Sequence, residues 1–283
     1  MYADLHIHSC FSDGTLYPQE IVRQAKSKGV SWISIADHDT VDAWDTFPAR
    51  CADEGLQALS AVELHARWGD ITCHILAYGF DLHHEAFRLF LKENRQRLDG
   101  MGDTLAKRMA AANPDLSWED FAAYSYQATR GGWKSINYLV DRGVAKDQKD
   151  AMKYYGMYGC TYEECGFLPA DQVCAQIKAA GGEPVLAHPG DYIPLGADFS
   201  ARLDDLLQKG ICGLECYYPL QDAAYTSACL EYCRRNDWII TCGSDFHGGF
   251  LPNTEICKLK VPIENLRLKG LADRFQGVFP QTE

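Results

Sequence analysis

Hydrophobic residues along the chain follow two alternating patterns, short apolar runs and longer stretches with helical spacing. The short runs predict strands at residues 2–8, 31–37, 57–63, 72–79, 184–188, 211–216 and 238–243. Helical segments separate several of these runs, and the first begins with Pro18 and ends at Gly29. Strands that alternate with helices predict an α/β fold with mostly parallel pairing, and seven strands suit a small or distorted barrel.

The alternation stops in the middle of the chain, between about residues 83 and 166. This stretch predicts only helices, at residues 87–112, 118–126, 133–142 and 148–155. We therefore expect a barrel built from residues 1–82 and 167–283. Residues 83–166 are expected to be a helical insertion that lies over one rim of this barrel.

Histidines and carboxylates gather at or just after the ends of the predicted strands. Nine of them are potential metal ligands: His6, His8, Asp13, His38, Glu63, His74, His188, Asp245 and His247. Residues so far apart in sequence meet where a fold brings its strand ends to one rim, as barrels of alternating strands and helices do. One such histidine alone is more often a surface or core residue, but the whole set predicts a polynuclear metal centre. Mixed nitrogen and oxygen ligands suit Zn, Mn or Fe better than Ca or Mg alone.

The amino-acid composition restricts the binding partners and the cellular compartment that we expect. The formal net charge of −12 argues against a broad basic surface for duplex nucleic acid. Cations in the predicted centre would still make that pocket attractive to phosphate. The 12 cysteines are scattered and are expected to be small buried residues of a cytoplasmic protein. No apolar run is long enough to span a membrane, and the early strand leads us to expect no signal peptide.

Four short motifs resemble those of the PHP (polymerase and histidinol phosphatase) family. They are Asp4-Leu5-His6-Ile7-His8-Ser9, Ala36-Asp37-His38-Asp39-Thr40, Ala187-His188-Pro189-Gly190 and Gly243-Ser244-Asp245-Phe246-His247. The resemblance covers the two chain segments assigned to the barrel. The insertion resembles, more loosely, that of phosphatases of nucleoside monophosphates and 3′,5′-nucleoside bisphosphates. That subfamily also includes an RNA exonuclease that trims 5′ ends.

The resemblance implies a distorted seven-stranded (β/α)7 barrel with two to three divalent metal ions, Mn, Fe or Zn. The ligand sets that it implies are His6, His8, Glu63 and Asp245 for the first ion, Glu63, His74 and His188 for the second, and Asp13, His38 and His247 for the third. It further implies hydrolysis by metal-activated hydroxide, with Asp13 or His247 as candidates to protonate the leaving alcohol. Every ligand position of the family pattern is filled, which argues against a degenerate copy.

Basic residues of the insertion are the candidates for substrate contacts. Arg130 is the arginine of a Thr-Arg pair that contacts phosphate in the resembling subfamily. Arg97 and then Arg95 follow as candidates, because a guanidinium binds phosphate through two hydrogen bonds. Gly132 stands where the subfamily often has a histidine, and Lys134 could replace that charge. The alternative for each basic residue is a solvated position on a helix.

Other residues near the motifs receive weaker assignments. Carboxylates that support the ligands or cap turns are expected at Asp37, Asp39 and Glu215. A loop or surface position is expected for the histidines outside the pattern, His65, His83 and His84. Cys10 is expected to pack rather than to act as a nucleophile, and Trp133 could stack on a base.

The sequence thus predicts a metal-dependent phosphoesterase that acts on small phosphomonoesters. Nucleotides, AMP or 3′,5′-nucleoside bisphosphates, are the favoured substrates. A 5′-3′ exonuclease on short RNA or DNA is a close alternative, and a histidinol-phosphate phosphatase is a further one. From a different class, a non-catalytic, metal-stabilised binding module stays open. No membrane partner is expected.

Overall fold

Two sheets form the centre of the computed structural model, which describes residues 1–252 and 254–276. The last seven residues of the predicted barrel segment therefore lie outside the described residues. The first sheet has the order β3-β2-β1-β9, with β1 (Tyr2–Ile7), β2 (Val30–Ile35), β3 (Gln57–Ala58) and β9 (Val261–Pro262). The second has the order β4-β5-β6-β7-β8, with β4 (Ala61–Trp68), β5 (Ile71–Tyr78), β6 (Glu183–Leu186), β7 (Gly213–Tyr217) and β8 (Ile239–Cys242).

Short backbone bridges join the two sheets where the predicted ligands lie. Ile7 at the end of β1 forms a parallel bridge with Phe246, just past β8. His38 after β2 forms another with Glu63 on β4. The mixed α/β fold predicted from the sequence is confirmed, and the bridges bring the strand ends of both sheets to one side.

Pairing in the second sheet differs from the expected parallel arrangement. The run at residues 57–63 is not one strand, because it divides between β3 and β4. β4 then continues to Trp68 and turns at Gly69 (φ 61°) into the antiparallel strand β5. β5 is also antiparallel to β6, whereas β6–β7, β7–β8 and the β1–β2–β3 pairs are parallel. A two-residue turn closes a hairpin without the helix that parallel strands need.

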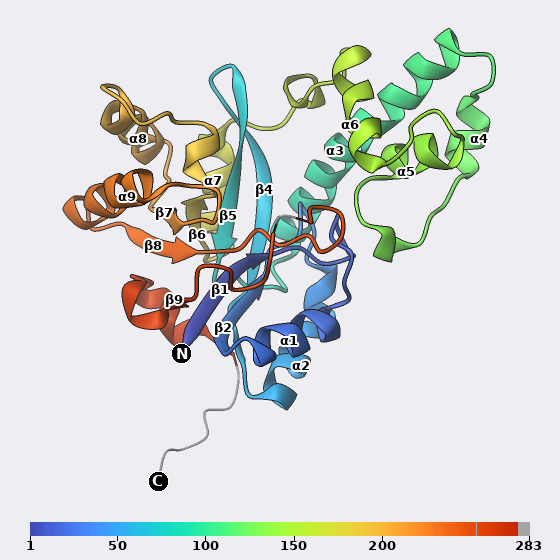
Figure 1. Cartoon of the computed structure of the whole chain (residues 1–283). Helices are drawn as coiled ribbons and strands as arrows, with labels where there is room; N and C mark the ends of the chain where they lie inside the picture. The colour runs from blue at the N-terminus through green and yellow to red at the C-terminus, as the bar shows by residue number, and fades with distance from the viewer. Residues whose placement is uncertain (253, 277–283) are drawn as a thin grey trace.

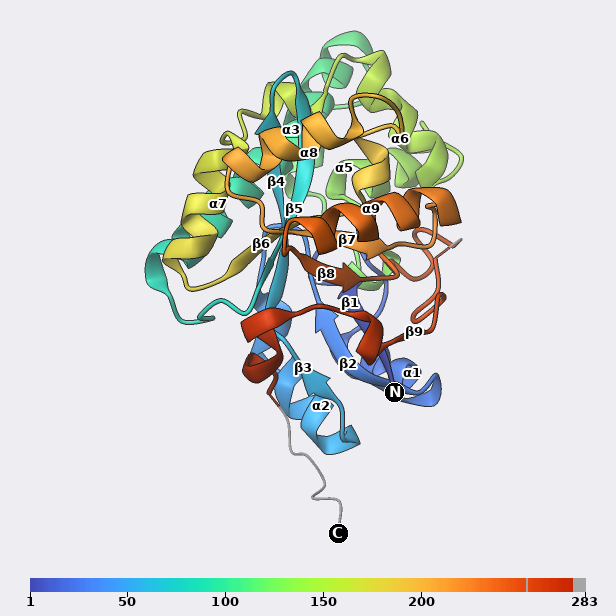
Figure 2. The same cartoon turned by 90° about the vertical axis from the view of Figure 1, so that its left-hand side faces the viewer.

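Helices cover the outer side of each sheet (Figures 1 and 2). They are α1 (Pro18–Ser27) and α2 (Phe47–Glu54) beside the first sheet, and α7 (Ala170–Ala179), α8 (Phe199–Gln208) and α9 (Ala223–Arg235) beside the second. Ile21, Val22 and Ala25 of α1 share one face and are buried, as helical spacing requires.

Four helices of the predicted insertion project away from the sheets at one end of the molecule (Figure 1). They are α3 (Glu85–Ala112), α4 (Trp118–Ala123), α5 (Lys134–Asp141) and α6 (Gln148–Met157). A second hydrophobic cluster that includes Leu105, Phe121 and Ile136 lies among them, separate from the core around the sheets. Within the described part of the chain, no helix is both long and apolar enough to cross a bilayer.

Candidate metal centre

His6 and His8 present their rings side by side where β1 ends. Both are fully buried, and their Nε2 atoms lie 3.1 Å apart. The backbone here is held by the chain after β8, because Asp245 N donates to His6 O (2.8 Å) and His8 N to Phe246 O (2.9 Å). Glu215 at the centre of β7 accepts a hydrogen bond from His6 Nδ1 at 3.0 Å and from His188 N at 2.8 Å. Glu215 thus orients ligands, as expected.

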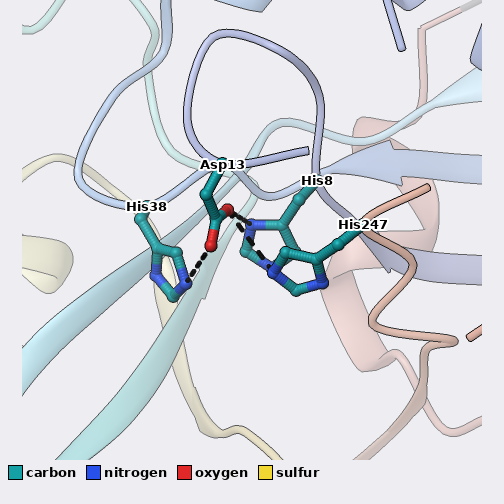
Figure 3. A group of neighbouring side chains, drawn as sticks. All are labelled: His8, Asp13, His38 and His247. Carbon is teal, nitrogen blue, oxygen red and sulfur yellow. Dashed lines mark ion pairs between the residues drawn. The ribbon is translucent and has the colours of Figure 1, made fainter. Parts of the chain in front are cut away.

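A tight loop after β1 places Asp13 against three imidazoles (Figure 3). Its carboxylate lies 3.6 Å from His8 Nδ1, 3.4 Å from His247 Nε2 and 4.0 Å from His38 Nε2. The loop leaves no room at Gly14, where a Cβ atom would meet His8 O at 2.4 Å. Glycine is therefore required at this turn.

Asp37 ties the same loop to the end of β2. It accepts hydrogen bonds from Ser9 N at 2.7 Å, from Ser9 Oγ at 2.6 Å and from Ser12 Oγ at 2.6 Å. Asp37 therefore has the supporting role expected for it, through the loop rather than through the ring of His38.

Glu63 is the central carboxylate of the cluster and is 1% exposed. Its Oε1 lies 3.1 Å from His74 Nδ1 and 3.0 Å from His188 Nε2. Its Oε2 lies 3.1 Å from His38 Nδ1 and 3.3 Å from the Nε2 atoms of His6 and His8. One side chain thus contacts imidazoles from strands of both sheets.

The backbone is strained at three positions of the site. Asp39, His188 and Asp245 have φ angles of 51°, 26° and 52°, in the left-handed region that side chains other than glycine rarely adopt. Such conformations cost of order 1–3 kcal/mol each and persist where the surrounding structure imposes them. Two of the three, His188 and Asp245, are predicted ligands, and Asp39 directly follows His38.

In the described part of the chain, four groups of side chains have the proximity that binding of a metal ion needs, and three of them consist of predicted ligands alone. These three are His6, His8, Glu63 and Asp245, then Glu63, His74 and His188, and then His8, Asp13, His38 and His247. These groups reproduce the three sets inferred from the family resemblance, with His8 added to the third.

The spacing of donor atoms fits metal ions. Ligand atoms about 2.0–2.1 Å from a tetrahedral ion lie roughly 3.3–3.4 Å from one another. The His6 Nε2–Glu63 distance of 3.3 Å, the His8 Nε2–Asp245 distance of 3.2 Å and the His247–Asp13 distance of 3.4 Å lie close to this value. The buried nitrogen and oxygen donors therefore suit divalent ions.

The protonation states of the clustered side chains also favour binding of divalent cations. Burial alone would raise the pKa of Glu63, but the neighbouring charges of His74 and His6 outweigh it and lower that pKa far below its usual range. Burial lowers the pKa of His38 and keeps its ring neutral. For His6, burial also favours the neutral ring, yet the charges of Glu63 and Glu215 raise its pKa well above the usual value. A site that draws in protons in this way lacks positive charge, which a metal cation supplies.

His65 corrects one of the sequence predictions. It lies on β4 and is 0% exposed, not in a loop or on the surface. Asp39 Oδ2 lies 2.7 Å from its Nδ1, so Asp39 orients the ring of His65 rather than that of His38. The strand that continues to Trp68 was missed in the sequence, and this explains the error. His83 is exposed and His84 caps α3, as a loop position predicts.

A cavity of about 680 Å³ opens over the cluster. Besides Asp13, His38, Glu63, His74 and His247, it is lined by Trp133, by Lys149 of α6, and by the segment around Phe250. Trp133 thus lies where its ring could contact a bound substrate, which agrees with the stacking on a base considered from the sequence. Lys149 had no distinguishing signal in the sequence, because it is one of several charged residues on a predicted helix.

The four basic residues predicted to bind substrate lie outside the lining of this cavity. Arg130 pairs with Asp141 at 2.8 Å, and Lys134 Nζ donates to a backbone carbonyl of α4 at 3.1 Å. Arg97 lies 3.8 Å from Glu93 along α3. Arg95 comes nearest, since its guanidinium covers the Trp133 ring at 5.1 Å and donates to His38 O at 3.2 Å.

Gly132 allows the chain before α5 to lie against the loop of Asp13 and against Phe250. Its φ is 64°, its N–H donates to Asp13 O at 2.8 Å, and a Cβ atom would meet the Phe250 ring at 2.8 Å. Phe250 therefore occupies the space in which a side chain at position 132 would lie.

Comparisons with known proteins agree with this geometry. The profile of the PHP domain matches residues 4–141. The 5′-3′ exoribonuclease Rnm of Salmonella typhimurium is 32% identical over 260 residues, which cover 86% of this chain and 84% of that protein. The chain belongs to the PHP family. A 3′,5′-nucleoside bisphosphate phosphatase of Chromobacterium violaceum is 29% identical over 252 residues, 86% of each chain.

One solved structure extends the similarity to almost the whole chain. This protein of Bifidobacterium adolescentis, assigned as a metal-dependent phosphoesterase, aligns with a TM-score of 0.78 and 26% identity, over 98% of this chain and 97% of its own. The class predicted from the sequence, a hydrolase acting on phosphoester bonds, is thus confirmed at the level of the family.

Proposed function

We propose that the protein is a metal-dependent phosphatase of nucleotides, which removes phosphate from AMP or 3′,5′-nucleoside bisphosphates. The observation that supports this most directly is the cavity in which Glu63, Asp13 and four imidazoles lie beside Trp133 and Lys149. A metal cluster binds one phosphate, an aromatic ring can stack on a base, and a lysine can bind a second phosphate.

The nine side chains predicted at the sequence level are the proposed ligands, for two to three divalent ions of Mn, Fe or Zn. When bound, such ions lower the pKa of water and neutralise charge on phosphate oxygens. The chain's own residues hold the donors in place, since Glu215 fixes the ring of His6 and Asp37 fixes the loop of Asp13. Ligand positions that are built before binding need little reorganisation during the reaction.

Asp13 and His247 are the candidates for proton transfer to the leaving alcohol. Burial favours a protonated Asp13, but the imidazoles of His247 and His38 beside it outweigh burial and hold the pKa of Asp13 far below its usual value. His247 Nδ1 lies 2.8 Å from Asp245 O, which leaves its Nε2 as the lone-pair nitrogen. Both features favour ligands over proton donors, so we propose metal binding as the first role of these two residues.

The basic residues predicted from the sequence to contact substrate are second to Lys149 as candidates for phosphate binding. Arg95 packs against the Trp133 ring, and this contact agrees with a role in base binding. For Arg97, Arg130 and Lys134, contact with phosphate would require these side chains to leave their present partners. We therefore propose Lys149 ahead of them as the cation for a second phosphate.

A 5′-3′ exoribonuclease is the second candidate function. The specific observation in its favour is the 32% identity to the exoribonuclease Rnm over most of both chains. A short RNA end would use the same cluster for a phosphodiester and the same Trp133 surface for its terminal base.

One experiment separates the two functions. The manganese-loaded protein is given 3′,5′-bisphosphoadenosine, AMP and a 5′-phosphorylated RNA of five nucleotides at equal concentration. We expect inorganic phosphate from the mononucleotides at a higher kcat/KM than nucleotides from the RNA. Faster release of mononucleotides from the RNA would favour the exonuclease and contradict the phosphatase.

The arrangement of the two sheets as a barrel and the division into domains are also part of the proposal. We propose that the two sheets, joined at Ile7–Phe246 and His38–Glu63, correspond to a distorted (β/α)7 barrel. Residues 83–166 are proposed as an inserted domain, since their helices share a hydrophobic cluster of their own. A cytoplasmic location stays a prediction from the scattered cysteines.

A further inference from the structure

His65 lies within the metal centre but outside the proposed ligand set. It faces His74 directly across the β4–β5 hairpin, and its ring centroid lies 4.5 Å from that of His74 and 4.9 Å from that of His38. Phe167 stacks on the His65 ring, with the ring centroids 4.9 Å apart. The ring thus lies against two proposed ligands and an aromatic side chain.

The two ring nitrogens of His65 have very different surroundings. Nδ1 lies 2.7 Å from Asp39 Oδ2, whereas Nε2 is buried and has no hydrogen-bond partner among the residues that the structure describes. Asn94 of α3 fixes this arrangement by donating to Asp39 Oδ1 at 2.6 Å and to His65 O at 3.0 Å. A proton on Nδ1, directed at the carboxylate, leaves a lone pair on Nε2.

This is the arrangement that metal-binding histidines have in proteins. Their second nitrogen usually donates to a carboxylate or carbonyl group, which fixes the ring and increases its basicity. A buried Nε2 without a partner costs free energy in a purely structural histidine, and a metal ion would remove that cost.

We propose that His65 is a further metal ligand and that His38, His65 and His74 bind an ion through one imidazole nitrogen each, as an alternative to the sets in which His38 joins Asp13 and His74 joins Glu63. The three residues offer donor atoms that all lie within 4.8 Å of one another. Unlike the other groups of the cluster, this one contains no carboxylate. Imidazole ligands suit Zn²⁺, whereas Mn²⁺ favours carboxylate oxygens, so this position is expected to select zinc.

The most direct test detects the metal–nitrogen bond in the full chain. The protein is labelled with ¹⁵N at histidine, stripped of metal and loaded with ¹¹³Cd²⁺, a spectroscopic substitute for zinc. We expect the His65 Nε2 resonance, assigned by its loss in His65→Ala, to be split by coupling to cadmium. An unsplit His65 resonance, with other histidines split, would overturn the proposal.

A binding experiment supplies a second readout. Competition with a chromophoric chelator is expected to show that His65→Ala lowers zinc affinity by about tenfold or more, within the range reported for changes around metal ligands. His84→Ala, which removes a histidine outside the cluster, should leave the affinity unchanged. Folding of His65→Ala is checked by circular dichroism, and equal zinc affinity in a folded variant would contradict the proposal. If that variant does not fold, the cadmium coupling in the wild-type chain decides alone, with resonances assigned through His84→Ala and the remaining single-histidine variants.

Discussion

Glu63 is the residue on which the metal centre depends most, because its carboxylate contacts five of the six proposed imidazole ligands. Glu63→Gln keeps the size of the side chain but removes its charge. We expect phosphate release to fall by about 100-fold or more, comparable to the loss of one charge-stabilising group in other enzymes. The measurement is kcat/KM with AMP at saturating Mn²⁺.

The matched control for this prediction is Glu93→Gln on the exposed side of α3. The same chemical change there should leave kcat/KM within about twofold, since surface substitutions rarely perturb a distant site. Comparable rates for Glu63→Gln and the wild type would show that this carboxylate holds no catalytic metal.

Substitution of Cys10 tests whether this thiol, which lies next to the first ligands, takes part in the reaction. Burial, with the charge of Asp37 as a smaller contribution, raises the pKa of its thiol to about 11. The thiol stays protonated at every pH below that value, so it is a poor nucleophile at pH 7–8. We expect Cys10→Ala to retain most of the phosphatase activity, and a loss above about tenfold in a folded variant would contradict this assignment.

At the scale of single elements, α6 provides the clearest test of substrate binding. Lys149 lines the cavity, whereas Lys153 one turn later pairs with Asp150 at 3.0 Å. We expect Lys149→Ala to raise KM for a 3′,5′-bisphosphate by about tenfold, roughly the contribution of one charge-assisted contact. AMP, which lacks the second phosphate, should be affected less.

Lys153→Ala serves as the control for that change, because it removes the same charge from the same helix. KM should stay near the wild-type value. If both substitutions raised KM equally, the effect would reflect the overall charge of α6 rather than a contact made by Lys149.

Docking of the insertion can be tested at Gly132. Gly132→Ala adds a Cβ atom at a φ of 64° and against the Phe250 ring, whereas Gly143→Ala adds it at a φ of 68° in open space. The left-handed conformation costs an alanine about 1–2 kcal/mol in both variants. Overpacking should add about 1–3 kcal/mol at Gly132 alone.

Chemical denaturation of the two variants checks this expectation. Gly132→Ala is expected to lose more free energy of unfolding than Gly143→Ala, and to lose activity through displacement of the loop of Asp13. Equal destabilisation would show that the turn at Gly132 is not packed against Phe250 in solution.

The elements themselves were largely predictable, and the exceptions have physical reasons. Helix α1 begins and ends within two residues of the prediction, because Pro18 and Gly29 mark its limits. The β4–β5 hairpin was not predicted as such, since an apolar run does not specify the direction of its neighbour. Its turn at Gly69 was the available signal, and recognising it would also have placed His65 inside the core.

At the scale of the whole molecule, the candidate centre was predictable because several rare residue types recur at strand ends. The three groups of neighbouring side chains match the predicted sets around Glu63, Asp13 and Asp245. Substrate contacts were less predictable, since they depend on how the helices of the insertion lie over the cluster. No local pattern distinguishes Lys149 from Arg130 before the two are placed in space.

The overall charge of the molecule agrees with a small anionic substrate only if cations occupy the centre. The chain has a formal charge of −12, and the site itself contains three carboxylates among the proposed ligands. Without metal, its field would repel a phosphate ester, and with two or three divalent ions it becomes locally positive.

Metal-dependent release of phosphate from AMP therefore tests the account most directly. The purified protein is stripped of metal, assayed, reloaded with Mn²⁺ and assayed again with the same substrate, with metal content measured in each state. The account predicts no release above background from the stripped protein and rapid release after reloading. Release that is independent of metal, or none from any phosphomonoester when the metals are bound, would contradict it.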